Sequence, residues 1–268
     1  MSKLRILYAA SEITPFLTTT SVADFVRALP KYMQEKELEI RILVPRFGLI
    51  SERKNRLHEV VRLSGINIAV GSDAKPLIIK VASIPNAKLQ VYFIDSEDYF
   101  KRKAVFHDKN NKFFEDNDAR TVFFCKGVLE TVKKLGWAPD IVHCHDWITS
   151  LIPLYLKTTY RNDPILKQAQ VIFTLYNNAF SHKFDGDLIE KAKMGGLRKE
   201  KLASLASADF GGLIQTGIKY ADVVVKSEAL EDANFKGLLD EKAFRHIENN
   251  EEGLAAYYNL YKKLAGVR

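Results

Sequence analysis

The stretch Asp140–Lys157 reads DIVHCHDWITSLIPLYLK, and it decides the fold. Its first part, Asp140–His145, is a short run rich in apolar and β-branched residues, typical of a strand that is buried on both faces. The next part, Trp147–Tyr160, has the length and apolar content of a helix. A buried strand that passes directly into a helix is the repeating unit of an α/β domain with a parallel sheet.

The same alternation continues on both sides of this stretch. Upstream, the apolar run Arg5–Ala10 and a second strand at Glu39–Pro45 flank a helical stripe over Ser21–Gln34. A long helix is predicted at Asp118–Leu135, where Gly136 and Pro139 mark the end. Further strands are predicted at Leu57–Val70, Pro76–Ile84, Leu89–Asp95, Ala169–Tyr176 and Ala221–Lys226. We therefore predict an α/β fold with a doubly wound, mainly parallel sheet.

The last forty residues have a different texture from the rest of the chain. They are charged and predicted to be helical, and we expect one or two amphipathic helices that pack back on the α/β domain. The apolar positions of this segment are Phe244, Ile247, Leu254, Tyr257, Tyr258, Tyr261 and Leu264. We predict one domain over residues 1–228 and a helical extension over residues 229–268 that packs on it.

The composition excludes several classes of protein. The chain has 268 residues, of which 47% are hydrophobic and 27% charged, as in ordinary globular proteins. The net charge of +7 permits a nucleic-acid partner, but the basic residues form no dense block. Cys125 and Cys144 lie in apolar segments, as expected for buried thiols in a reducing compartment. With no signal peptide or membrane span in the sequence, we expect a cytoplasmic protein without nucleic-acid or membrane partners.

Neither a cofactor nor a metal is predicted. The glycine pairs Gly195–Gly196 and Gly211–Gly212 lack the spacing of a dinucleotide or P-loop motif, so they indicate turns. We take His143 and His145 to face opposite sides of their strand, which would prevent them from binding one metal. No Cys, His and Glu cluster has the spacing of a structural zinc site.

Polar residues follow three of the predicted strands. These are Ser11–Glu12, His145–Trp147 and Tyr176–Asn178. Ligands of open α/β sheets bind outside the carboxyl ends of the strands, so these residues are expected to line one cleft. Asp146 fits equally well as a helix cap. Asp24 fits either a surface position on its helix or a position that faces the cleft.

Several stretches together resemble the amino-terminal half of bacterial glycogen synthases and plant starch synthases, which form glycosyltransferase family 5. The resemblance covers about residues 4–226 in order and spacing, and DIVHCHDW with the following Pro153 is its most specific part. The matching stretches are ILYAASEITPF (Ile6–Phe16), ADFVRALP (Ala23–Pro30), EIRILVPRFG (Glu39–Gly48), VYFID (Val91–Asp95) and GWAPDIVHCHDWITSLIPLYLK (Gly136–Lys157).

The resemblance implies a GT-B architecture, with two Rossmann-like domains and the active site between them. The family transfers glucose from ADP-glucose to the non-reducing end of an α-1,4-glucan, with retention and without a metal. Its amino-terminal domain holds the acceptor glucan and part of the sugar donor. By this resemblance, the catalytic residues are His145, Asp146 and Asn177, and the substrate-binding residues are Glu12, Asp24 and Tyr176.

The sequence departs from the family pattern in four places. Thr18–Val22 replaces a Lys-Thr-Gly-Gly-Leu loop whose lysine supplies charge and whose glycines let the backbone approach a phosphate or sugar closely. Tyr176 stands where the family has a histidine, and Gln215–Ile218 replaces Lys-Gly-Gly-Ile. The chain ends at Arg268, whereas the other GT-B domain would need a further stretch of roughly 150–200 residues.

Two interpretations of function follow. The chain is a glycogen or starch synthase-like glucosyltransferase that a separate chain or self-association completes, or it is a non-catalytic glucan-binding or regulatory module of glycogen metabolism. Both predict an α-glucan partner, and both predict that the isolated chain is inactive or needs a partner. Whether ADP-glucose binds is left open by the sequence.

Overall fold

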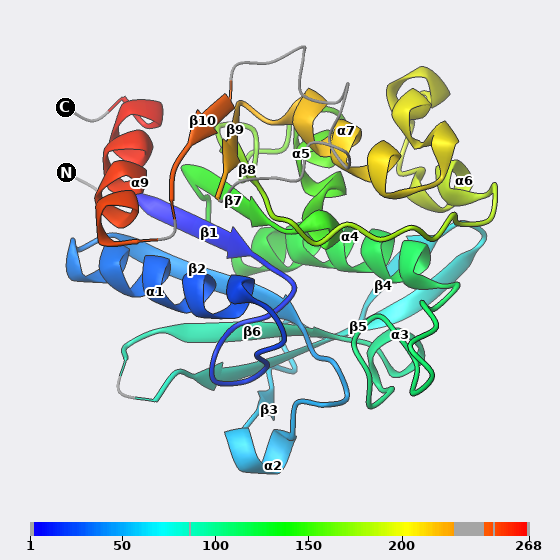
Figure 1. Cartoon of the computed structure of the whole chain (residues 1–268), viewed down its shortest axis with the longest axis horizontal. Coiled ribbons are helices and arrows are strands. Elements are labelled where there is room, and N and C mark those ends of the chain that lie inside the picture. The colour runs from blue at the N-terminus through cyan, green and yellow to red at the C-terminus, as the bar shows by residue number, and fades with distance from the viewer. Residues whose placement is uncertain (1–2, 86, 228–243, 249, 267–268) are drawn as a thin grey trace.

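The computed structural model describes residues 3–85, 87–227, 244–248 and 250–266, which are built around one large sheet (Figure 1). The strands in these residues are β1 (Arg5–Ala9), β2 (Glu39–Pro45), β3 (His58–Glu59), β4 (Ile66–Val70), β5 (Asp73–Ser83), β6 (Gln90–Asp95), β7 (Ile141–His145), β8 (Gln170–Leu175), β9 (Val223–Lys226) and β10 (Phe244–His246). Their order across the sheet is β10-β9-β8-β7-β1-β2-β6-β5-β3, and β4 pairs with β5.

The sheet is doubly wound, as predicted. Every pair from β10 to β6 is parallel, whereas β5 runs antiparallel to β6, β3 and β4. The order β6-β2-β1-β7-β8-β9 is the 3-2-1-4-5-6 order of Rossmann-type sheets. The winding direction changes between β1 and β7, and the crevice at such a switch point is where these sheets bind ligands.

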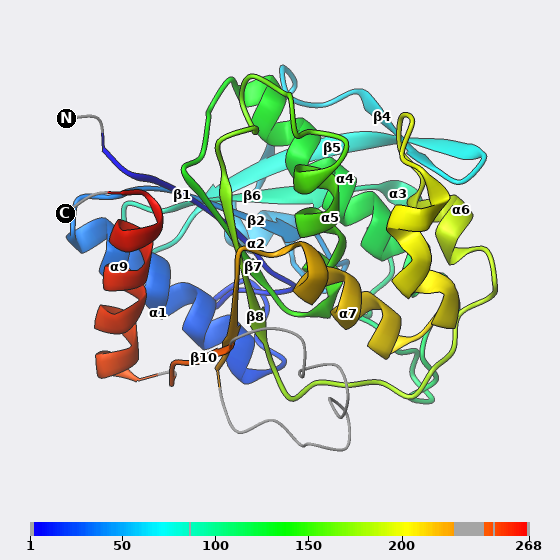
Figure 2. The ribbon, with the colours of Figure 1, turned by 90° about the horizontal axis from the view of Figure 1, so that it is seen from above.

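Helices cover both faces of the sheet (Figures 1 and 2). One face carries α1 (Ser21–Glu35) and α9 (Glu251–Leu264), which lie side by side. The other face carries α4 (Asn117–Leu135), α5 (Leu151–Lys157) and α7 (Phe210–Tyr220). The shorter elements are α2 (Glu52–Asn55), α3 (Glu97–Phe100), α6 (Leu188–Ala192) and the 3-10 helices Trp147–Thr149 and Lys199–Ser207.

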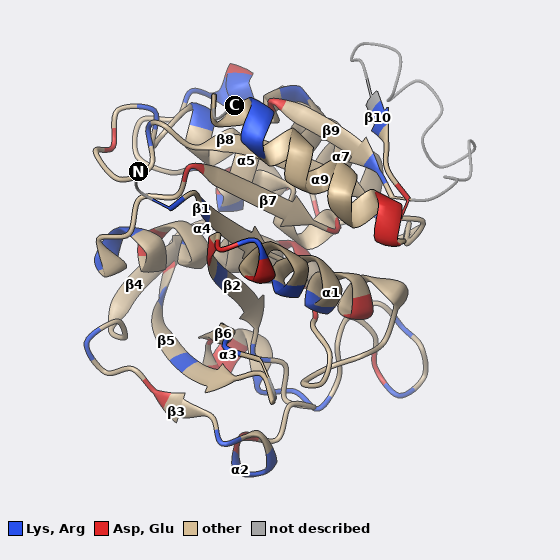
Figure 3. Ribbon diagram, turned by 90° about the vertical axis from the view of Figure 1, so that its left-hand side faces the viewer, with Lys and Arg blue, Asp and Glu red and all other residues tan. Residues whose placement is uncertain are grey.

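The sequence sets the start of each of the two helices on the first face. The Oγ1 of Thr20 caps α1 by accepting a hydrogen bond from the N–H of Val22 at 3.2 Å. Asn250 caps α9 through the N–H of Gly253 at 2.8 Å. The first turn of α9 is acidic and its last turn basic, which complements the helix dipole (Figure 3).

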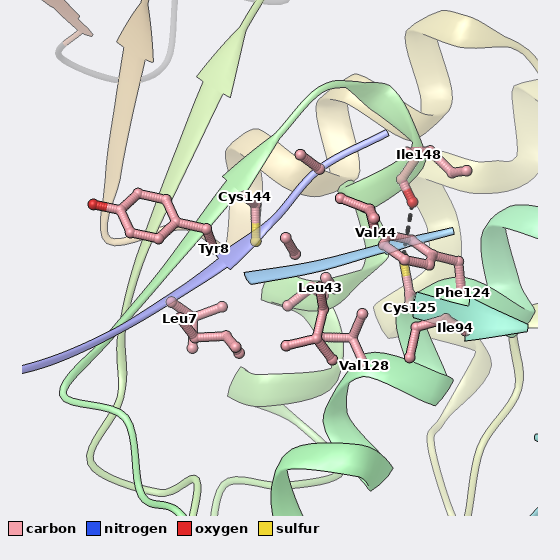
Figure 4. Close-up of a cluster of buried hydrophobic side chains, with 14 of the residues drawn as sticks. Leu7, Tyr8, Leu43, Val44, Ile94, Phe124, Cys125, Val128, Cys144 and Ile148 are labelled. Carbon is pink, nitrogen blue, oxygen red and sulfur yellow. Dashed lines mark hydrogen bonds between the residues drawn. The ribbon is translucent and has the colours of Figure 1, made fainter. Parts of the chain in front are cut away.

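The core between the sheet and α4 contains both cysteines (Figure 4). Cys125 donates from its thiol to the carbonyl oxygen of Ile148 at 3.1 Å, and Cys144 is buried in the same core. Tyr8 points to the other face, because side chains alternate along a strand. Two buried thiols were predicted, and both are present as free cysteines.

Three predicted elements differ from the observed ones. The strand expected over Leu57–Val70 is divided into β3 and β4 by a turn at residues 61–63, and Gly65 directly before β4 has a φ of 85°. The helix expected over Trp147–Tyr160 begins as a 3-10 turn, and α5 ends at Lys157. Within the predicted helical extension, Phe244–His246 is a strand parallel to β9, too short for its period to be recognised. Residues 228–243 and 249 lie outside the described residues, and the domain boundary at residue 228 stays a prediction.

Candidate functional site

A cavity of about 650 Å³ lies at the switch point of the sheet, beyond the carboxyl ends of β1 and β7. Its walls include residues that follow three strands: Glu12 after β1, Asp146 and Trp147 after β7, and Asn178 after β8. The structure thus brings the polar ends of these three strands to one cavity. Its volume is in the range of small-molecule sites.

Glu12 is buried, and its carboxylate holds the loop before α1. Oε2 accepts hydrogen bonds from the N–H and Oγ1 of Thr19, at 2.6 and 2.7 Å. Oε1 accepts them from the N–H and Oγ1 of Thr20, at 2.8 and 2.5 Å. Thr19 and Thr20 therefore hold the Glu12 carboxylate and fix this wall of the cavity. They belong to the loop Thr18–Val22, which replaces the Lys-Thr-Gly-Gly-Leu loop described above.

Asp146 both lines the cavity and caps the turn that follows it. Its Oδ1 accepts the N–H of Trp147 at 2.6 Å and a hydrogen bond from the side chain of Asn178. Burial raises the pKa of Asp146 to about 6, although hydrogen bonds from Ser11, Asn178 and Trp147 oppose the shift. Its φ of 75° is unfavourable for a residue with a side chain, and such strain concentrates at functional sites.

The buried side chains of His145 and Tyr176 lie on the face of the sheet that α1 and α9 cover, and neither side chain lines the cavity. The Nδ1 of His145 is 2.7 Å from the hydroxyl of Tyr176. The prediction that His143 and His145 face opposite sides was wrong, because residues two apart on a strand share a face. Their ring centroids are 3.9 Å apart.

His143 belongs to the same buried cluster and connects it to α9. Its Nδ1 lies 2.6 Å from the hydroxyl of Tyr261, and its Nε2 lies 2.7 Å from the Oγ1 of Thr174. The ring of Tyr8 lies against both histidines. The cluster therefore holds the last helix on the central strands.

Asp24 and Asn177 are exposed and do not line the cavity. Asp24 accepts a hydrogen bond from the Oγ1 of Thr14 at 2.6 Å, so it has the surface position that the sequence allowed. The neighbouring Asn178 lines the cavity instead of Asn177. Of the six residues assigned by resemblance, Glu12 and Asp146 therefore meet at the cavity, and the functional roles of all six stay predictions.

An aromatic wall, formed by Phe106, Phe113, Trp147 and Phe180, was not predicted. Phe113 and Phe180 are stacked with centroids 4.6 Å apart, and Trp147 lies 4.6 Å from Phe106 and 4.9 Å from Phe180. The four rings come from three separate segments, and no spacing in the sequence relates those segments. The only signal in the sequence is that the segments between the strands are rich in aromatic residues.

Arg120 on α4 fixes the loop that carries Phe106. Its Nε donates to the carbonyl of Tyr99 at 2.8 Å, and its Nη1 donates to the carbonyl of Val105 and the Oδ1 of Asn117, both at 2.6 Å. The side chain is fully buried. One arginine thus joins three segments behind the aromatic wall.

The permanently charged side chains around the cavity are acidic. In the described part of the chain, the lining residues include the carboxylates of Glu12 and Asp146 and the imidazoles of His107 and His182, but no lysine or arginine. Aromatic rings beside buried acceptors suit a neutral ligand with hydroxyl groups better than an anion.

Among the described residues, no three His, Cys, Asp or Glu side chains are grouped to hold a metal. No described helix is long and apolar enough to span a membrane.

The buried histidines make stability depend on pH, and we expect the free energy of unfolding to fall on acidification. Burial lowers the pKa of His145 from 6.5 to about 3 and that of His143 well below 6.5. Below pH 6.5 both histidines become protonated in the unfolded chain but stay neutral in the folded chain. The free energy of unfolding therefore decreases as the pH falls below 6.5. The raised pKa of Asp146 offsets part of this loss below about pH 6. The net loss from pH 7 to pH 5 is roughly 2 kcal/mol.

Urea unfolding at a series of pH values measures this dependence. The variant His145→Gln is expected to show a clearly shallower fall than the wild type. His58→Gln, which changes an exposed histidine, serves as the matched control and is expected to keep the full fall. An equal fall in wild type and His145→Gln would show that His145 does not cause it.

Comparisons with known proteins agree with this geometry. A model of the starch synthase catalytic domain matches residues 5–229. Glycogen synthase of Chlorobium luteolum is 37% identical over 231 residues, which are 84% of this chain and 46% of that protein. Glycogen synthase of Pelodictyon phaeoclathratiforme is 38% identical over 260 residues, 96% of this chain and 52% of that protein. The catalytic domain of starch synthase IV from Arabidopsis thaliana, solved with ADP and acarbose, aligns with a TM-score of 0.70 at 19% identity and covers 98% of this chain and 50% of that chain.

The doubly wound sheet with a cavity at its switch point defines a Rossmann-like domain of the GT-B glycosyltransferase class. Its sequence match covers more than half of the chain. The chain belongs to the starch synthase catalytic domain family, as the motif around His145 indicated. It spans about half the length of the glycogen synthases it matches.

Proposed function

We propose that this domain binds an α-1,4-glucan in the cavity at the switch point and presents it as the acceptor for glucosyl transfer. The aromatic wall is the observation that carries the proposal. The apolar face of a sugar ring packs on aromatic rings, and the half-buried rings of Phe106 and Phe180 line the cavity. The buried ring of Trp147 supports Phe180 by an edge-to-face contact at 4.9 Å. The carboxylate of Asp146 lies in the same cavity and can accept hydrogen bonds from sugar hydroxyls.

The charges of the cavity favour the glucan over the nucleotide sugar. A diphosphate needs positioned cations, and the described lining of this cavity has no lysine or arginine to supply them. Glu12 and Asp146 would repel its negative charge. We therefore propose that transfer from ADP-glucose needs a donor-binding domain, supplied by a separate chain, that adds the cations. Without such a partner, the domain is a glucan-binding module of glycogen metabolism.

Replacing Phe180 by alanine is expected to weaken binding to glycogen roughly tenfold, because one stacking face of the cavity is lost. Phe180 is half-buried, so the fold should survive the change. Affinity electrophoresis in gels that contain glycogen measures the dissociation constant. Adding ADP at the same time tests the charge argument, and ADP is expected not to compete.

Tyr32→Ala is the matched control, since Tyr32 is a half-buried aromatic residue on α1 away from the cavity. It should bind glycogen like the wild type. The proposal fails if Phe180→Ala retains full affinity, or if Tyr32→Ala loses as much. Strong competition by ADP would show that the cavity takes the nucleotide.

A further inference from the structure

A second cavity, of about 530 Å³, lies at the opposite edge of the sheet. One wall is residues 157–162, at the end of α5, and another is residues 195–201. Tyr220, the last residue of α7, closes it. The first and last of these segments precede the amino ends of β8 and β9, whereas the glucan cavity follows the carboxyl ends of the strands. The two cavities are therefore separate sites.

The charges of this second cavity are the reverse of those in the first. Lys157, Arg161, Arg198 and Lys201 line it, and no carboxylate does so within the described residues. Lys157 forms an ion pair with Asp222 at 2.6 Å. The other three cations are exposed, and their side chains have no ion pair or hydrogen bond in the part of the chain that the structure describes.

Uncharged hydrogen-bond donors in the cavity are also unused. Gly195 and Gly196 follow one another at φ values of 33° and 69°, and neither N–H has an acceptor among the described residues. Successive free N–H groups in such conformations form an anion-binding concavity. The buried Oγ1 of Thr159 likewise lacks a hydrogen-bond partner in the described structure.

The wall that carries two of the cations is fixed in place. The hydroxyl of Tyr220 donates to the carbonyl oxygen of Lys201 at 2.9 Å. The N–H of Lys201 in turn donates to the carbonyl of Arg198 at 3.0 Å. The backbone of this wall is thus held before any ligand arrives, which reduces the entropy lost on binding.

We propose that this second cavity binds the phosphate group of a small phosphorylated molecule. A guanidinium matches the geometry of phosphate oxygens, a lysine adds a point charge, and free N–H groups complete the coordination. The volume is that of a small-molecule site. A neutral glucan would leave three cations unpaired, so the site has a different ligand from the cavity at the switch point. The inference does not depend on the proposed function.

Titration calorimetry at constant ionic strength tests the site, with inorganic phosphate as the first probe. Glucose 1-phosphate and ADP follow as probes, and their relative affinities distinguish a sugar phosphate from a nucleotide as the source of the phosphate. We expect saturable binding that the double variant Arg198→Ala/Lys201→Ala weakens roughly tenfold or more, because two charge-assisted contacts are removed. Both side chains are exposed, so the variant should keep its melting temperature and its affinity for glycogen.

Arg53→Ala/Lys54→Ala on α2 is the matched control, since it removes the same two charges from exposed positions outside the cavity. It should bind phosphate like the wild type. Equal weakening in both double variants would mean that only net charge matters and would overturn the site. No saturable heat with any of the three probes would also overturn it. Loss of glycogen binding in Phe180→Ala with phosphate binding intact would show the two sites to be independent.

Discussion

Replacing Tyr261 by alanine is expected to lower the free energy of unfolding by about 3–5 kcal/mol, in the range of large aromatic truncations in a core. The side chain is fully buried between α9 and the central strands. Its ring lies 6.4 Å from Tyr8 and 6.2 Å from Tyr257, so truncation leaves a cavity in an aromatic cluster. It also leaves the Nδ1 of His143 buried without its partner. Urea unfolding at neutral pH measures the loss.

Two variants separate the causes of this loss. Tyr261→Phe removes only the hydroxyl and should cost about 1–3 kcal/mol, the penalty of an unsatisfied buried group. Tyr258→Ala truncates the half-buried tyrosine three residues earlier on α9 and should cost about 1 kcal/mol. If Tyr261→Ala is no less stable than Tyr258→Ala, α9 is not seated on the sheet as described.

Replacing Arg120 by methionine is expected to lower the free energy of unfolding by about 3 kcal/mol or more and to weaken glycogen binding. The change leaves three acceptors without a donor, and each buried unsatisfied group costs about 1–3 kcal/mol. The guanidinium also lies within 5.2 Å of the centroid of the Phe47 ring. Glycogen binding should weaken because the carbonyl of Val105 loses its hydrogen bond from Arg120. Val105 precedes Phe106, so this ring of the aromatic wall is then held less firmly.

Arg102→Met is the control for Arg120, because it removes an arginine that is half-exposed and paired with Asp116. Such a pair contributes about 1 kcal/mol or less. Arg120→Lys keeps the charge but not the planar guanidinium. Its loss in free energy of unfolding should therefore be smaller than that of Arg120→Met and larger than that of Arg102→Met. Stability loss with unchanged glycogen affinity in Arg120→Met would show that the aromatic wall does not depend on this arginine.

The parallel strands other than β10 could be predicted from the sequence to within a residue or two. Strands β1, β7 and β8 are continuous apolar runs because both of their faces are covered. Helix α6 and the 3-10 helix Lys199–Ser207 could not be predicted, since short and 3-10 helices carry no sustained apolar period. Strand β10 has three residues, and only its pairing with β9 makes it a strand.

The candidate site could be predicted only in part. The rule that ligands bind at the carboxyl ends of parallel strands led to Glu12 and Asp146, which line the cavity. His145 ends the same strand, but its side chain follows the pleat to the face beneath α9, away from the cavity. The aromatic rings of the wall belong to loops whose positions depend on tertiary contacts such as those of Arg120.

The bond between His143 and Tyr261 joins residues 118 positions apart, and this separation has a consequence for the protein during its synthesis. A ribosome adds roughly 5–20 residues per second, so about 6–24 seconds pass between the two residues. Throughout that interval the nascent chain carries its central strands with the aromatic patch around Tyr8 still uncovered. Exposed apolar surface of this kind attracts chaperones and other unfinished chains. Slow translation of the last segment would therefore lower the yield of folded protein without changing a single contact in the finished molecule.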